Sequence, residues 1–163
     1  QAKDILVYVY GYLEDRVPEA LQLAQELSET YPKNPYYRAL EADLHFAMEQ
    51  IAEAEEAMTA IPPLLAEVDT FYVEEQKNKL VYLRGLLNYH QGDYEQAIKL
   101  LNRYIHENVD EYDLHAVNAE LYLGKSYQKL DQMIPARRYF VSVSKSDVPT
   151  RMKAEARELL NQI

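Results

Sequence analysis

The stretch Val81–Tyr104, VYLRGLLNYHQGDYEQAIKLLNRY, constrains the fold more than any other part of the chain. Two apolar patterns of helical spacing flank the polar run Gln91-Gly92-Asp93, which predicts two helices folded back on each other across a tight turn. Gly85 on the first helix and Ala97 on the second are the small residues at which we expect the two backbones to approach each other. The stretch therefore predicts a helical hairpin.

The hairpin pattern recurs along the chain in one frame. Four pairs of residues are each twelve positions apart, and successive pairs are offset by 34, 43 and 39 residues; they are Tyr8 and Ala20, Ala42 and Ala54, Gly85 and Ala97, and Gly124 and Ala136. The residues that we assign to helix packing in this frame are Ala20, Ala54, Gly85, Ala97, Gly124 and Ala136. Because one hairpin cannot bury its own apolar face, stacked neighbours must build the core.

The helical patterns and their stop signals predict the elements of an all-α fold, and no segment shows the alternation of a β-strand. Asn34 and Asp93 are expected to cap helices, Pro62-Pro63 to interrupt one, and Ser146–Pro149 to start the last one. This last helix has no predicted hairpin partner. The expected helices are 2–13, 17–30, 35–48, 51–61, 69–90, 94–106, 114–130, 134–143 and 149–163, with a short helical turn at 64–68.

Length and charge narrow the classes of function. A chain of 163 residues corresponds to a single domain, here hairpins at about 1–34, 35–68, 69–108 and 110–145 and a capping helix at 149–163. The net charge of −10, without a basic patch, argues against nucleic-acid partners. The absence of cysteine excludes disulfides, thiolate metal sites and a cysteine nucleophile. The absence of an apolar run of about 18 residues argues against membrane insertion. Gln1 at the start indicates a fragment or a processed product, so the compartment, cytoplasmic or exported, stays open.

Several residues resemble a known repeat motif. They are Leu123, Gly124, Tyr127, Ala136 and Phe140 in the last unit, Gly92, Asp93, Tyr94 and Ala97 in the third, and Pro32 at the end of the first. In these positions the chain resembles the tetratricopeptide repeat family, whose pattern is L-G-x-x-Y, A-x-x-x-F and a late proline. The resemblance covers nearly all of the chain, although Tyr8 stands in place of a small residue and no unit has the motif's tryptophan. Its last half also resembles bacterial repeat proteins in which such arrays form the C-terminal part.

The resemblance implies a right-handed superhelical array of about four antiparallel helical hairpins with a capping helix. Arrays of this family are protein-interaction scaffolds, and the first helix of each hairpin lines their concave groove. The residues that the frame points into this groove are Tyr12, Tyr36, Asp43, Phe46, Lys79, Tyr82, Leu86, Tyr89, Asn118, Leu121, Lys125 and Gln128. Such an aromatic and polar face suits a bound peptide or partner helix.

Residues that could carry chemistry are sparse. The four histidines, His45, His90, His106 and His115, lack the helical spacing of a zinc pair. An acidic cluster could bind a hard cation, but it lacks the glycine-bearing calcium loop, so a solvated connector is the favoured reading; its members are Asp110, Glu111, Asp113, His115 and Glu120. The sequence therefore predicts no enzyme activity, metal or cofactor.

Two classes of function remain open. The first is a scaffold that binds a protein or peptide in the tyrosine-rich groove. The second is a structural module that self-associates or packs on an upstream repeat through its apolar first helix, Ile5–Leu13, because a helix that is apolar nearly all round is normally buried. A homo-oligomer is compatible with the second class.

Overall fold

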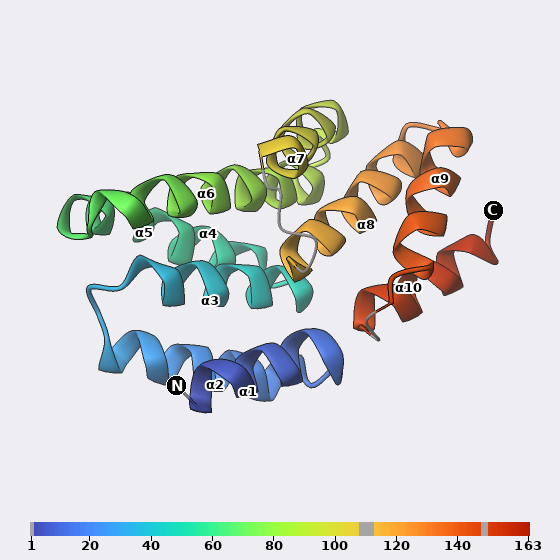
Figure 1. Ribbon diagram of the computed structural model, residues 1–163. Coiled ribbons are helices and arrows are strands. Elements are labelled where there is room, and N and C mark those ends of the chain that lie inside the picture. The colour runs from blue at the N-terminus through green and yellow to red at the C-terminus, as the bar shows by residue number, and fades with distance from the viewer. Residues whose placement is uncertain (1, 108–112, 148–149) are drawn as a thin grey trace. The chain divides into compact units, whose positions relative to one another are not determined.

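The structure is a computed structural model that describes residues 2–107, 113–147 and 150–163 (Figure 1). The chain divides into two compact units, Gln1–Leu83 and Arg84–Ile163. The described part of the chain contains helices and turns and no strand, which confirms the all-α prediction. Helix α6 (Thr70–His90) belongs to the first unit over its N-terminal part and to the second over its C-terminal end.

The first unit is built from successive helices that pack against their neighbours in sequence. Helix α1 packs on α2, α2 on α3, and α3 on α4 and α5. The elements are α1 (Ala2–Tyr8), the π-helix η1 (Val9–Leu13), α2 (Val17–Thr30), α3 (Pro35–Ala47), α4 (Ile51–Thr59), α5 (Ile61–Leu64), the 3-10 helix η2 (Leu65–Glu67) and the start of α6. The core between α1, α2 and α3 is formed by Val7, Val17, Ala20, Leu21, Ala24, Leu27, Tyr37, Leu40 and Leu44.

The second unit follows the same rule. Helix α7 packs on α8, α8 on α9, and α9 on α10. These elements are α7 (Tyr94–Glu107), α8 (Leu114–Lys129), α9 (Met133–Ser144) and α10 (Arg151–Leu160). Figure 1 shows α10 running beside α9 at the C-terminal end of the chain. The last helix therefore has packing partners within the chain, whereas the sequence pattern gave it none.

The four hairpin turns share one backbone conformation. Each contains a residue with positive φ, and these residues are 34, 43 and 39 positions apart, the same offsets as in the sequence frame; they are Asp15, Glu49, Gly92 and Asp131. In each case the second helix of the hairpin begins two residues later. The agreement between backbone and frame confirms the predicted series of four hairpins.

The last three turns also share their hydrogen bonds. In the turn after α6, the amide of Gly92 donates to the carbonyl of Tyr89 and the amide of Asp93 donates to that of Asn88, at 3.1 and 2.9 Å. The same pair of bonds closes the turns after α3 and α8, and it defines a Schellman motif. Asp93 then caps α7 through the amide of Gln96, 3.1 Å away, as the sequence predicts.

The residues assigned to helix packing are all buried in the structure; they are Ala20, Ala54, Gly85, Ala97, Gly124 and Ala136. A Cβ atom built on Gly85 would lie 2.6 Å from Leu101 Cδ2 and 3.5 Å from the Leu101 amide nitrogen. A Cβ on Gly124 would lie 2.5 Å from the ring of Phe140. Helices α6 and α7, and likewise α8 and α9, therefore approach each other at glycine, although the nearest atoms belong to a residue one turn beyond the paired alanine.

Three details differ from the sequence prediction. The first helix ends as a π-helix, and Gly11 rather than Tyr8 meets Ala20, since a Cβ on Gly11 would lie 3.2 Å from the Ala20 Cβ. Pro62 and Pro63 occupy the first turn of α5 instead of interrupting a helix, because a proline in a first turn leaves no hydrogen bond unmade. Helix α10 begins at Arg151 with Thr150 as its cap; Val148 and Pro149 lie outside the described residues.

Candidate functional site

Three predicted groove residues of the first unit, Tyr12, Asp43 and Tyr82, form a buried network. Asp43 on α3 accepts hydrogen bonds from the hydroxyls of Tyr12 on η1 and Tyr82 on α6, the latter at 2.5 Å. Tyr82 is 0% exposed, and Asp43, Phe46 and Tyr12 are also buried. Burial raises the pKa of Tyr12 well above its ordinary value, and the negative charge of Asp43 adds to this effect. The donors offset the cost of burying the Asp43 carboxylate, so this network holds three helical elements together.

Two predicted groove residues of the first unit remain partly exposed, Tyr36 and Lys79. The Tyr36 hydroxyl lies 2.6 Å from that of Tyr8, and the Lys79 ammonium lies 6.0 Å from the centre of the Tyr82 ring. The predicted groove residues of α6 therefore differ in exposure, because Tyr82 is buried while Lys79 and Tyr89 are partly exposed.

In the second unit the structure brings Tyr89 and Lys125 together. The Lys125 ammonium lies 5.5 Å from the centre of the Tyr89 ring, 4.5 Å from that of Tyr122, and 2.8 Å from a carboxylate oxygen of Glu155. Tyr89 and Tyr122 meet edge to face at 5.0 Å. Sequence reasoning missed Tyr122 as a partner of this pair.

The remaining predicted groove residues are Leu86, Asn118, Leu121 and Gln128. The first three are buried and Gln128 is partly exposed. A groove that binds a peptide through the whole predicted set stays a prediction, and only its partly exposed members can touch a ligand without a change of conformation.

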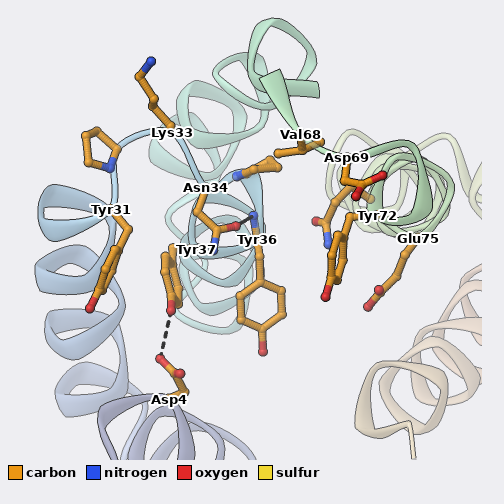
Figure 2. Close-up of a pocket in the computed structure, with 13 residues that line it drawn as sticks. Asp4, Tyr31, Lys33, Asn34, Tyr36, Tyr37, Val68, Asp69, Tyr72 and Glu75 are labelled. Carbon is orange, nitrogen blue, oxygen red and sulfur yellow. Dashed lines mark hydrogen bonds between the residues drawn. The ribbon is translucent and has the colours of Figure 1, made fainter. Parts of the chain in front are cut away.

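A pocket of about 920 Å³ in the first unit was not predicted from the sequence (Figure 2). It lies where the start of α1, the connection between α2 and α3, and the start of α6 meet. The lining residues are Asp4, Tyr31, Pro32, Lys33, Asn34, Pro35, Tyr36, Tyr37, Val68, Asp69, Tyr72, Glu75 and Gln76. Tyr36 thus belongs both to the predicted groove and to this pocket.

Local sequence explains how the pocket is built. The Asn34 side chain accepts a hydrogen bond from the Tyr36 amide at 3.1 Å and so caps α3, as predicted, while Pro35 occupies the first turn. This cap fixes Tyr36 and Tyr37 on the first turn of α3. On α6, Tyr72 and Gln76 are four residues apart, which places them on one helix face, and Asp69 lies directly before the helix.

Tyr37 is the most enclosed tyrosine of the pocket. Its hydroxyl donates to Asp4 Oδ1 at 3.2 Å, and its ring lies 5.7 Å from that of Tyr31 and 5.4 Å from that of Tyr36. Burial, together with the negative charge of Asp4, raises the pKa of Tyr37 to about 12. Figure 2 shows the hydroxyls of Tyr31, Tyr36, Tyr37 and Tyr72 pointing in the same direction.

The charged groups of the pocket are mostly acidic. Asp4, Asp69 and Glu75 contribute carboxylates, whereas the single lysine, Lys33, forms an ion pair with Glu67 at 3.0 Å. Gln76 is 3% exposed, and its Oε1 atom has no hydrogen-bond partner among the residues that the structure describes. The pocket therefore offers aromatic surface, negative charge and one buried acceptor.

Sequence reasoning missed this site because it joins three segments that lie far apart in the chain. The sequence predicts that one helix ends at residue 30 and the next begins at residue 35, which the structure confirms, but the pattern does not show that α6 comes close to this connection. The only available signal was the pair Tyr36-Tyr37 directly after a helix cap.

Other kinds of site find no support in the described part of the chain. No group of three or more His, Cys, Asp or Glu residues there could hold a metal ion. Asp110 and Glu111 of the acidic cluster lie outside the described residues. Asp113 caps α8 by accepting a hydrogen bond from the His115 amide, and it accepts a second one from the Tyr104 hydroxyl. None of the described helices has the length and apolar character needed to cross a bilayer.

Comparison with known proteins bears on the hairpin of α6 and α7. No curated protein matches the chain. Residues 80–108 match the family described as Tetratricopeptide repeat. The matched segment contains the close approach of Gly85 to Leu101 and the Schellman turn at Gly92. Residues 80–108 are therefore similar to a tetratricopeptide repeat, a motif that generally mediates protein interactions.

Proposed function

We propose that the chain is a non-catalytic scaffold that binds a peptide or a helix of a partner protein. The observation that carries the proposal is the tyrosine-lined pocket of about 920 Å³, a size within the range of ligand sites in proteins. Tyrosine supplies a large contact area with a polar end, and aromatic anchors provide much of the binding energy at protein interfaces. The tetratricopeptide repeat at residues 80–108 supports a role in protein interactions.

The binding surface that we propose joins this pocket to the accessible members of the predicted groove in the first unit, Tyr36 and Lys79. In the second unit the partly exposed members of the predicted groove are Tyr89, Lys125 and Gln128. Rim charges such as Lys79 would affect the salt dependence of binding more than its strength.

Selection of peptides from a random library against the full chain tests the proposal. Tyr72→Ala should weaken a selected peptide by about 2 kcal/mol, as measured by calorimetry, because Tyr72 is an exposed aromatic side chain of the pocket. Its melting temperature should stay near that of the wild type. Ile134→Ala is the matched control, since Ile134 is an exposed apolar residue outside the pocket. Failure to select any binding peptide, or equal losses in both variants, would contradict the proposal.

The second candidate function is self-association or packing on a further repeat through α1. The observation that favours it is the exposure of two adjacent apolar residues, Ile5 at 63% and Leu6 at 37%. Their helix was expected to be buried because it is apolar nearly all round, and in the structure Val7 is buried in the core with α2 and α3 while Ile5 and Leu6 are exposed. Such a face fits a second copy of the chain or a neighbouring repeat.

A further inference from the structure

We propose that the tyrosine-lined pocket of the first unit binds an arginine side chain presented by a segment of the partner protein. This inference rests on the proposed function, because it names the chemical group that the interaction surface recognises. Three independent properties of the pocket point to a guanidinium group: its aromatic surface, its buried acceptor and its charge.

The aromatic surface fits a flat cation. Tyr31 and Tyr72 are 39% and 55% exposed, so part of each ring is open to a ligand. The guanidinium group stacks on aromatic faces and is attracted to their negative potential. A neutral apolar side chain would also gain from contact with the rings, so the choice between the two depends on the polar groups.

The buried acceptor of Gln76 favours a ligand that donates a hydrogen bond. Its side chain is buried in the wall of the pocket, and its Oε1 has no partner among the described residues. A buried acceptor without a donor is costly, and a ligand N–H that reaches it would remove this cost. Guanidinium offers five N–H donors in a fixed plane, whereas a trimethylated ammonium offers none.

The charge of the pocket selects a cation over an anion. Three carboxylates line it, and Glu75 is exposed at its edge beside Tyr72. Figure 2 shows the Lys33 side chain extending away from the tyrosine rings, and Glu67 pairs with its ammonium. Arginine fits better than lysine because its guanidinium is more weakly hydrated and can stack on a ring and donate to Gln76 at the same time. A pocket of about 920 Å³ also accommodates the residues that flank the arginine.

The test uses four peptides of sequence acetyl-Ala-Ala-X-Ala-Ala-amide, in which X is arginine, citrulline, lysine or glutamate. Citrulline retains the shape of arginine and three of its five N–H donors but has no charge. Each peptide is titrated into the full chain, and binding is followed by nuclear magnetic resonance through the backbone amide signals of the chain. We expect the arginine peptide to shift Tyr36, Tyr37, Tyr72 and Gln76, and to bind about tenfold more tightly than the citrulline peptide. The glutamate peptide should leave these resonances unchanged.

Two variants test the residues that carry the inference. Gln76→Met keeps the volume of the side chain but removes the acceptor, so it should weaken the arginine peptide about tenfold while the melting temperature stays equal or rises. Glu75→Gln should weaken the peptide roughly threefold, as expected for an exposed charge. Glu55→Gln on α4 is the matched control, because Glu55 is exposed and lies outside the pocket.

The outcomes separate this inference from the proposed function. Equal binding of the arginine and citrulline peptides, or unchanged affinity in Gln76→Met, would overturn the arginine assignment. The arginine assignment is also wrong if the arginine peptide does not bind while Tyr72→Ala still weakens a library-selected peptide. In that case the scaffold function stands. If no library peptide binds at all, both proposals are wrong.

Discussion

At the scale of single residues, the four turns share a backbone conformation with positive φ but have different residue types at that position. Gly92 has φ of 86°, and Asp15, Glu49 and Asp131 have φ between 52° and 58°. This left-handed conformation is unfavourable for residues with a Cβ atom, and glycine adopts it freely. The sequence could show the turn at Gly92 because glycine marks it, whereas the acidic residues of the other turns give no such signal.

Glycine should therefore stabilise the turns that lack it. Replacement of Glu49 or Asp131 by glycine should raise the free energy of unfolding by about 0.5–1 kcal/mol, and Gly92→Ala should lower it by about 1 kcal/mol. Urea denaturation measures both effects. Glu55→Gly, in the interior of α4, is the control and should be destabilising by about 1 kcal/mol. A loss of stability in Glu49→Gly similar to that of the control would contradict this account.

The hydroxyl of Tyr37 should make the stability depend on pH in alkaline solution. Its pKa of about 12 in the folded protein exceeds the ordinary tyrosine value of 10.0, so the folded state favours the protonated hydroxyl. This contribution is fully present below about pH 10 and is lost as the pH rises through 12. Compared with Tyr37→Phe, the wild type should lose stability between these values, measured by denaturation at a series of pH values. A constant difference between the two proteins across this range would show that Tyr37 is not the cause.

The burial of Tyr82 predicts a structural role for this residue. Tyr82→Ala should lower the free energy of unfolding by about 3 kcal/mol or more, because it removes a fully buried ring and a hydrogen bond to Asp43. Tyr89→Ala should cost less, since Tyr89 is partly exposed. Thermal melting of both variants checks the comparison. Equal, small losses of stability in both variants would mean that Tyr82 belongs to the predicted groove and not to the core.

At the scale of helices, the sequence predicted most of the elements because apolar residues recur at helical spacing and prolines mark several starts. It predicted α2 from Val17 to Thr30 as the structure has it. It could not predict which side of each first helix faces a neighbouring element, because Tyr82 and Phe46 are apolar enough for the core and polar or aromatic enough for a binding face. The pocket was missed for a similar reason, since it depends on contacts between segments far apart in the chain.

The close approach of paired helices gives a prediction at this scale. Gly85→Leu and Ala97→Leu should each lower the free energy of unfolding by about 1–3 kcal/mol, because added atoms at a close contact force the neighbouring side chains out of their preferred rotamers. For Gly85 the displaced residue is Leu101, 2.6 Å from the position of the new Cβ. Arg84→Leu is the matched control, because Arg84 is the exposed neighbour of Gly85 and should tolerate the change. Unchanged melting of both test variants would mean that the helices are paired differently.

At the scale of the whole molecule, the chain divides into two compact units that each consist of helices packed on their sequence neighbours. Local packing of this kind is expected of repeat arrays, whose stability is close to a sum of units and nearest-neighbour contacts. The assignment of the full chain to one repeat domain stays a prediction. The outer face of α1, with Ile5 and Leu6, is where a further copy or repeat could add to the series.

Molar mass distinguishes the two candidate functions. If α1 mediates self-association, the wild type should sediment as a dimer at micromolar concentration, and Ile5→Lys should sediment as a monomer because a charge cannot be buried there without a partner. Glu29→Lys is the control, since Glu29 is exposed on α2 and the charge change is in the same direction. A wild type that stays monomeric at high concentration, while binding a selected peptide, would leave the scaffold function alone.

The π-helix Val9–Leu13 makes the first hairpin differ from the other three in the number of residues that its turn closure spans. Its turn is closed by a bond from the Arg16 amide to the Tyr10 carbonyl, one residue further back than the corresponding bonds from Gln50, Asp93 and Gln132. A π-helix holds one residue more than the α-helix it replaces. Deletion of one residue from this segment should therefore convert it to an α-helix and give the first turn the closure of the other three. The π-helix marks the place in this array where the chain can become one residue shorter while the hairpin is kept.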